Sequence, residues 1–204
     1  MSLLYAMDLF GTAVFAVSGG LMAARKRYDI FGFVVVALAP AVGGGTLRDI
    51  ALGALPVFWV QDVAYLWVTT LAAVATFFLA KRIARYMGAL LVADAVGLAL
   101  FAVVGADKAL LFGTRPEIAV AMGVVTASFG GMMRDVLCRE EPLILRREIY
   151  ATAAILGAVL FVAVDILTLN RAAAMVMGFA AALALRLFAV WRKLSLPVYS
   201  EEEG

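Results

Sequence analysis

The chain has 204 residues, of which 65% are apolar, and its mean hydropathy is +1.02. Soluble globular domains contain about 45–50% apolar residues, so this composition excludes an ordinary soluble fold. The formal net charge is only +2, and the basic residues form short clusters rather than one stripe, which argues against nucleic-acid binding.

Seven apolar runs follow one another along the chain, each near the roughly 20 residues that a helix needs to cross a bilayer. They span residues 3–24, 30–56, 57–80, 88–110, 116–138, 147–168 and 172–190. The runs are apolar on all sides and lack the polar face of an amphipathic helix in a soluble protein. We therefore predict an all-α integral membrane protein with seven transmembrane helices.

The second half of the sequence repeats the first at an offset of 86 residues. Gly43–Asp49 (GGGTLRD) returns as Phe129–Asp135 (FGGMMRD), and the same offset relates Asp8 to Asp94. Each copy has three apolar runs, an odd number, so the second copy enters the membrane from the opposite face, as in inverted-repeat transport proteins. The predicted units are a first three-helix repeat at 1–86, a second, inverted one at 87–170, a seventh transmembrane helix at 171–191 and a cytoplasmic tail at 192–204.

The basic residues are distributed unequally between the two sides of the predicted membrane. Of the 17 Lys and Arg residues, 13 fall on the side of the loop that follows the first run. The other side carries Arg48, Lys108, Arg115 and Arg171. The positive-inside rule then predicts an outside N-terminus and a cytoplasmic C-terminus in a bacterial or archaeal cytoplasmic membrane.

Glycines interrupt the second and fifth runs at corresponding places, Gly43–Gly45 and Gly130–Gly131. Each interior glycine costs a helix roughly 0.5–1 kcal/mol relative to alanine, and Pro40 removes a further hydrogen bond, so we expect a kink or a short unwound turn. Freed carbonyl groups at that depth need protein or water beside them, which points to a passage for a polar solute. The glycines also suit close packing of neighbouring helices, and the two interpretations are compatible.

An arginine and an aspartate follow each glycine cluster. Adjacent side chains on a helix point about 100° apart, so we expect other partners for the arginines. Asp8 and Arg48 both lie roughly 24–27 Å above the inner boundary by helical rise, and their copies match. We predict the ion pairs Asp8–Arg48 and Asp94–Arg134, with Asp49 and Asp135 freer to attract cations. The predicted pathway residues are Gly43, Gly44, Gly45, Thr46, Arg48, Asp49, Ser128, Gly130, Gly131, Arg134 and Asp135, with Asp8 and Asp94 as charge partners.

The doubled Gly-Gly-x-x-Arg-Asp motif, in two three-span repeats with a seventh span, resembles the prokaryotic branch of the trimeric intracellular cation (TRIC) channel family. The resemblance covers about residues 5–190. It implies a homotrimer in which each protomer has its own pore for potassium and other monovalent cations, lined by spans 2 and 5. Met132-Met133 stand where animal members carry a Lys-Glu-Val element.

The leading hypothesis is thus a potassium-permeable channel without a resident cofactor, partnered by its own copies and by membrane lipids. The alternative is a secondary transporter of glycine or a similar small zwitterion, since bacterial relatives carry a glycine transporter label. A third class is a non-conducting scaffold. An enzyme is not expected, because the chain has no histidine, no nucleophile–base pair and a single cysteine, Cys138, which also argues against a metal site.

Overall fold

The computed structural model describes residues 3–83 and 88–197, and this part of the chain is helical. Its elements are α1 (Leu3–Arg25), α2 (Ile30–Leu52), α3 (Phe58–Gln61), α4 (Ala64–Ile83), α5 (Ala89–Leu111), α6 (Pro116–Leu137), the 3₁₀ turn η1 (Leu143–Leu145), α7 (Ala151–Thr168) and α8 (Arg171–Arg192). Seven of these helices are long and apolar enough to cross a membrane. The predicted all-α fold with seven spans is confirmed. Residues 198–204 of the predicted tail lie outside the described range.

Local chemistry explains where the helices begin and end. The Asp29 carboxylate accepts a hydrogen bond of 2.7 Å from the Gly32 N–H and caps the start of α2. Gly53 ends that helix with φ +69°, a left-handed conformation that favours glycine. At α8, the Asn170 side chain accepts from the Ala173 N–H at 3.1 Å. Short polar links therefore separate helices whose interiors are almost wholly apolar.

Two predicted spans begin later in the structure than in the sequence analysis. The run 57–80 divides into α3 and α4, because the Asp62 carboxylate accepts from the Ala64 N–H at 2.9 Å and starts a new helix there. The run 147–168 begins only with α7 at Ala151, after the η1 turn. These apolar stretches lie at the ends of the bundle, where polar groups can interrupt them.

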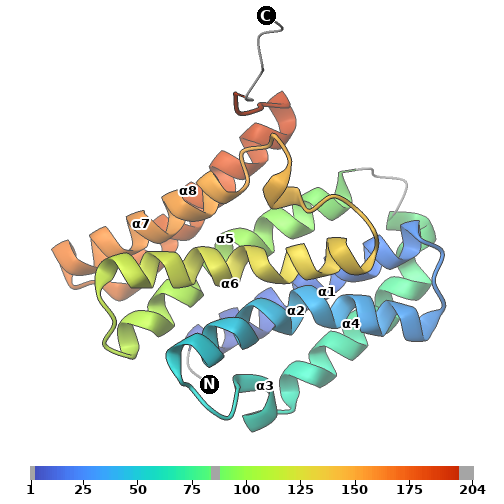
Figure 1. The fold of residues 1–204 in the computed structure, drawn as a ribbon, viewed down its shortest axis with the longest axis horizontal. Coiled ribbons are helices and arrows are strands. Elements are labelled where there is room, and N and C mark those ends of the chain that lie inside the picture. Colours follow the sequence, from blue (N-terminus) through green and yellow to red (C-terminus); the bar gives the residue numbers. More distant parts are fainter. Residues whose placement is uncertain (1–2, 84–87, 198–204) are drawn as a thin grey trace, which may run out of the picture.

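The helix boundaries repeat with the sequence. Both ends of α1 and α5 differ by the same 86 positions, and α2 and α6 begin 86 positions apart. Figure 1 shows that α2 and α6 cross the molecule side by side in opposite directions. An inverted repeat requires this antiparallel arrangement.

Contacts between the two halves are reciprocal. A Cβ atom at Gly11 would lie 3.1 Å from the Phe101 ring, and one at Gly97 would collide with the Phe15 ring. The two rings stack with centroids 5.2 Å apart. The second contact joins the residues that lie 86 positions from those of the first. If residue i contacts residue j, a two-fold axis requires that the copy of i contacts the copy of j. An approximate two-fold axis therefore passes between α1 and α5.

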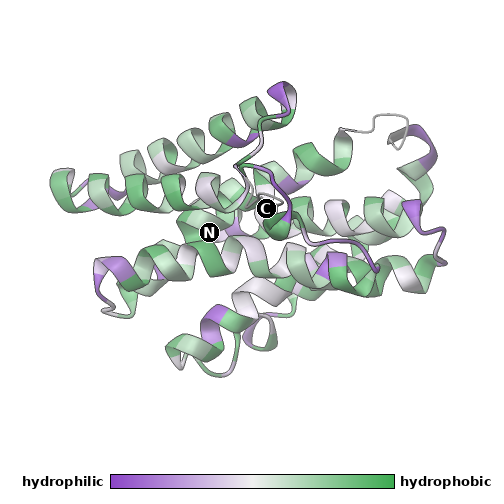
Figure 2. Cartoon of the chain, turned by 45° about the horizontal axis from the view of Figure 1, so that its top comes forward, coloured by the Kyte–Doolittle hydropathy of each residue, from purple (hydrophilic) through white to green (hydrophobic). Residues whose placement is uncertain are grey.

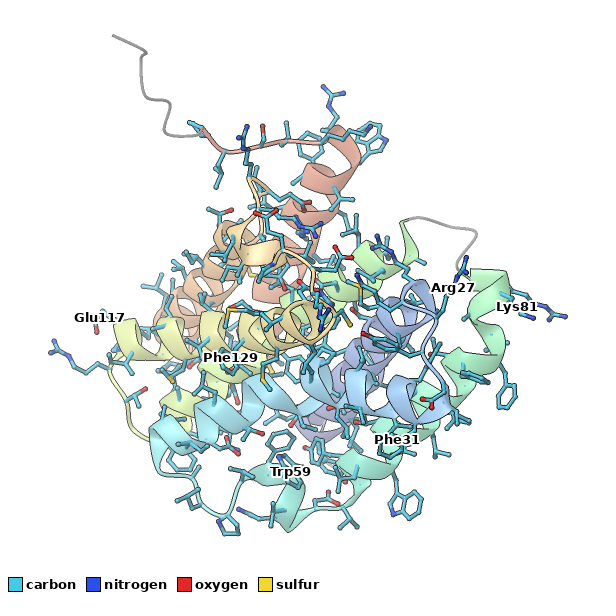
Figure 3. The ribbon with its side chains drawn as sticks, turned by 45° about the vertical axis from the view of Figure 1, so that its right-hand side comes forward. Arg27, Phe31, Trp59, Lys81, Glu117 and Phe129 are labelled. Atoms are coloured by element: carbon cyan, nitrogen blue, oxygen red, sulfur yellow. The ribbon has the colours of Figure 1, made fainter. Side chains whose placement is uncertain are left out.

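The most buried helix is α5, of whose apolar window 72% is buried, against 28% for α4 and α8. Figure 2 shows hydrophobic residues along the outer faces of the helices and hydrophilic residues mainly near helix ends and loops. The charged residues labelled in Figure 3, Arg27, Lys81 and Glu117, lie at such ends. Large apolar side chains such as Phe31 are exposed. This distribution suits a surface that faces hydrocarbon.

Candidate functional site

The second copy of the motif forms a buried ionic network, the second cluster, which consists of Ser18, Asp94, Arg134 and Asp135. Arg134 donates from one terminal nitrogen to Asp94 Oδ1 at 2.6 Å and to Ser18 Oγ at 2.5 Å. Its Nε donates to Asp135 Oδ1 at 2.8 Å. Both aspartates and the arginine are almost completely buried. The predicted Asp94–Arg134 ion pair is present.

The first copy, the first cluster, consists of Arg48, Asp49 and Lys108 and is paired differently. Arg48 Nε donates to Asp49 Oδ1 at 2.9 Å, and Lys108 Nζ lies 2.9 Å from the same oxygen. Asp8 instead accepts a hydrogen bond of 2.8 Å from the Tyr65 hydroxyl. The predicted Asp8–Arg48 ion pair is wrong. Asp49 holds Arg48 because the two residues are adjacent and the carboxylate is fixed in place.

Adjacent arginine and aspartate residues therefore pair in both copies, contrary to the prediction. The angle of 100° describes where the Cβ atoms point, whereas the arginine side chain is long enough to fold back to its neighbour. Each aspartate is also an anchor for the backbone. Asp49 Oδ2 accepts from the Phe58 N–H and Asp135 Oδ2 from the Leu143 N–H, both at 3.0 Å.

Asp49 and Asp135 thus tie the short elements α3 and η1 to α2 and α6. Both carboxylates are buried and already have several donors. The expectation that they would be freer to attract cations is wrong. Buried carboxylates take charge-assisted hydrogen bonds wherever donors are within reach, because an unpaired buried charge is costly.

The glycine clusters do not unwind their helices. Both α2 and α6 remain helical through the glycines, so the predicted unwound turn is wrong. A Cβ atom at Gly130 would lie 2.6 Å from the Pro40 carbonyl oxygen, and one at Gly44 would collide with the Thr126 carbonyl oxygen. These contacts are again reciprocal copies. Close approach of the helices compensates for the low helix propensity of glycine, and the backbone groups keep their intrahelical hydrogen bonds.

The other predicted pathway residues also pack within this crossing. A Cβ atom at Gly43 would lie 2.8 Å from the Met133 sulfur, and one at Gly45 would lie 2.7 Å from the Phe58 ring. The hydroxyls of Thr46 and Ser128 donate to the carbonyls four residues earlier in their own helices, each at 2.7 Å. Small and polar residues here allow contact and satisfy their own hydrogen bonds.

A cavity lies beside the arginine of each motif copy. The large cavity, of about 250 Å³, reaches the second cluster. Its lining includes Leu21, Met22, Arg25, Ala89, Arg134, Asp135, Arg146 and Glu148. The small cavity, of about 10 Å³, has room for about one water molecule and is lined by Asp8, Pro40, Ala41, Gly45, Arg48, Phe58, Phe101 and Thr126. No lining residue is shared between the two.

Two ionisable groups outside the spans fasten the connecting segments. The Tyr5 hydroxyl, which donates to Asp62 at 2.5 Å, lowers the pKa of that carboxyl, and the Ala64 N–H adds to the effect. The Lys26 ammonium, 2.7 Å from Glu140, lowers the pKa of the Glu140 carboxyl. Both pairs are partly exposed to solvent or headgroups, so each contributes modestly to stability.

Comparison with known proteins identifies relatives of this chain. The family model described as "Glycine transporter" matches residues 5–81 and 91–165. A Vibrio cholerae "UPF0126 membrane protein" is 46% identical over 98% of this chain and 84% of its own length, and Escherichia coli K12 "UPF0126 inner membrane protein YadS" is 45% identical over 99% of both chains.

Solved structures agree more specifically. The TRIC trimeric intracellular cation channel orthologue from Rhodobacter sphaeroides superposes with a TM-score of 0.92 at 49% identity, covering 95% of this chain and 100% of that one. A second TRIC cation channel structure matches all of both chains with a TM-score of 0.89 at 33% identity. The chain belongs to the TRIC channel family.

Membership of the TRIC family, with seven apolar helices and inner-membrane relatives, makes this chain an integral protein of the bacterial inner membrane. The solved structures that it resembles are cation channels and not enzymes, in agreement with the sequence analysis.

The sequence analysis missed four residues that lie in or beside the two clusters of this TRIC-family protein. Tyr65 and Tyr150 take similar places in the two halves but are 85 positions apart, so the offset of 86 did not reveal them. Arg186 lies on α8, outside the repeat, yet it is buried beside Tyr150. Lys108, which the sequence analysis used only for the orientation in the membrane, binds Asp49. The sequence signal that could have revealed Arg186 is its position inside an otherwise apolar run.

Proposed function

We propose that the chain is a potassium-permeable monovalent cation channel, with a pore inside each protomer that follows the α2–α6 crossing. One observation carries the proposal: two separate cavities lie within the bundle, and each is lined by the arginine of one motif copy. The ionisable residues at that depth are costly and typical of ion pathways. Similarity to TRIC cation channels supports the same function.

The conformation described here is proposed to be closed. The reciprocal contacts of Gly44 with Thr126 and of Gly130 with Pro40 hold α2 and α6 together, and the two cavities share no lining residue. The first cluster closes one end and the second cluster the other, through their arginine–aspartate pairs. Opening would then require α2 and α6 to separate and the clusters to rearrange.

Weak ion selectivity follows from the intact helices. Because the glycine carbonyls stay in intrahelical hydrogen bonds, they do not form a ring of oxygens that replaces the hydration shell of an ion. A permeating cation would keep part of its water and meet side chains such as Asp94. We therefore expect potassium permeation with little discrimination against sodium.

We further propose an outside N-terminus, a cytoplasmic C-terminus and a homotrimer in contact with membrane lipids. The orientation follows the excess of basic residues and places the large cavity on the cytoplasmic side. An apolar groove of about 460 Å³ along α2 and α6, lined in part by Val42, Trp59 and Phe129, opens to the surface. A neighbouring protomer or a lipid chain would cover it.

Single-channel recording in planar bilayers with a potassium gradient tests the function. Discrete ohmic steps that reverse near the potassium equilibrium potential are expected. Silent bilayers, together with saturable glycine uptake into liposomes that contain the same preparation, would instead establish the transporter that the family model's description suggests.

A further inference from the structure

The end of the molecule at the second cluster carries a contact that has no counterpart among the contacts described at the other end. Arg186 of α8 is completely buried, and its side chain lies next to the segment between η1 and α7. It donates to Glu148 Oε2 at 2.7 Å and to the Ile149 carbonyl oxygen at 3.1 Å. Its guanidinium lies over the Tyr150 ring, 4.9 Å from the centroid. One arginine therefore holds three consecutive residues.

Tyr150 connects Arg186 to the second cluster. A Cβ atom at Gly131 would lie 3.0 Å from the Tyr150 hydroxyl and 3.4 Å from Asp94 Oδ1, so the hydroxyl and the Asp94 carboxylate are neighbours around Gly131. Yet the Tyr150 hydroxyl and Asp94 Oδ2 are both buried without a hydrogen-bond partner. Such groups are rare because each one loses its hydration without compensation.

The first half shows what the corresponding two groups do when no arginine lies over the tyrosine ring among the described contacts. There the Tyr65 hydroxyl donates to Asp8 Oδ2 at 2.8 Å, and Arg48 is not bound to Asp8. The acid that precedes Tyr65, Asp62, stands 86 positions before Glu148 and is held by the Tyr5 hydroxyl instead of by an arginine. The Tyr65 ring packs against Phe58, with centroids 4.6 Å apart, and no cation lies over it among the described contacts.

We propose that Arg186 is a positioning residue for the second cluster, which keeps Tyr150 from donating to Asp94 and so preserves the Asp94–Arg134 ion pair. The guanidinium fixes the ring from one side while Glu148 and Ile149 fix the backbone before it. When this restraint is lost, the Tyr150 hydroxyl turns to Asp94, as Tyr65 does to Asp8, and competes with Arg134. The seventh span thereby controls opening at one end only.

This inference rests on the proposed conduction path, and its test uses the full-length protein in planar bilayers. Arg186→Met removes the charge and the hydrogen bonds while keeping much of the length of the side chain. We expect the ratio of open to closed time to rise roughly tenfold, the scale found when residues share one hydrogen-bond network. Unitary conductance is expected to stay unchanged, because Arg186 does not line either cavity.

Arg171→Met is the matched control. Arg171 is also on α8 and also forms an ion pair, with the buried Asp107 of α5 at 2.6 Å, but it lies at the opposite end of the helix. A purely structural loss of an ion pair between α8 and its neighbours would affect both variants alike. R171M is expected to lower thermal stability without changing the ratio of open to closed time.

Tyr150→Phe tests whether Arg186 acts through the Tyr150 hydroxyl or only by stabilising the packing of α8. Added to R186M, it should return the ratio of open to closed time to the wild-type value. The proposal is overturned if R186M folds and gates like wild type, or if the rise persists in the double variant. Should R186M not fold, Arg186→Lys keeps a charge but not the double contact, and the same outcomes apply.

A chemical readout distinguishes this proposal from the proposed function. Ala89→Cys places a thiol on the lining of the large cavity, in a Cys138→Ala background. A charged methanethiosulfonate reagent should modify it faster in R186M than with Arg186 intact. Absence of conduction in the wild-type protein would refute the channel, whereas equal modification rates would refute the role of Arg186.

Discussion

The two motif copies have the same arginine and aspartate at the same helical positions, yet they form different ion pairs. In the first cluster Asp49 receives both Arg48 and Lys108, and Asp8 is left to Tyr65. In the second cluster Arg134 bridges Asp94 and Asp135. The position that corresponds to Lys108 is Met22, and among the described ion pairs Asp135 has Arg134 alone. A duplicated motif thus specifies which groups meet, and unduplicated neighbours decide how they pair.

The largest expected difference between the clusters is in stability. Arg134→Met would leave Asp94 and Asp135 buried without their cation, a loss of about 3–5 kcal/mol. Arg48→Met leaves Asp49 with Lys108 and the Phe58 N–H, so about 2 kcal/mol is expected. Thermal unfolding of the purified protein in detergent measures both. Equal losses in the two variants would show that Lys108 does not compensate.

Glycine substitutions at the crossing should come next. Gly130→Ala brings a Cβ against the Pro40 carbonyl, and Gly44→Ala against that of Thr126, so each should cost about 1–3 kcal/mol through overpacking. Gly88→Ala is the control, since open space surrounds that position. If the contacts also separate the cavities, both variants that fold should have altered conductance. Wild-type stability in either would contradict the close contact.

The lysine that distinguishes the clusters can be moved. Lys108→Met should ease opening at the first cluster, and Met22→Lys should add a competing cation in the large cavity near Asp135. Each change is expected to shift the ratio of open to closed time by about tenfold, in opposite directions, on the scale of a charged hydrogen bond. Single-channel recording of both variants and of their combination tests this. Shifts in the same direction would refute the idea that this lysine accounts for the difference between the clusters.

The smallest expected effect concerns the loop beside the second cluster. Because Lys26 lowers the pKa of Glu140 in the folded protein, the pair stabilises above the unfolded Glu pKa of about 4.3, and the contribution is lost as pH falls through the lowered folded value. Lys26→Met should cost under about 1 kcal/mol at pH 7 and almost nothing at strongly acidic pH. Thermal unfolding across this range measures the difference. A cost that grows on acidification would contradict the assignment.

Much of the fold could be predicted because length and apolarity define spans directly. The contacts between the two halves follow the same offset of 86, although Pro40 and Thr126 are different residue types at matching positions. The glycines were harder to interpret, since a glycine cluster in a sequence is expected both where a helix unwinds and where two helices pack closely. Only the position of Pro40 against Gly130 shows that packing prevailed.

The sequence by itself determined the seven spans, the repeated motif and the motif charges that lie beside the two cavities. The tertiary structure decided which carboxylate each arginine binds, that Asp49 and Asp135 anchor α3 and η1, and that Arg186 from the seventh span reaches Tyr150. The physical reason is the length of the arginine side chain. An arginine can meet any acceptor within several ångströms of its Cβ, so the choice among buried partners depends on three-dimensional positions that spacing along the chain does not contain.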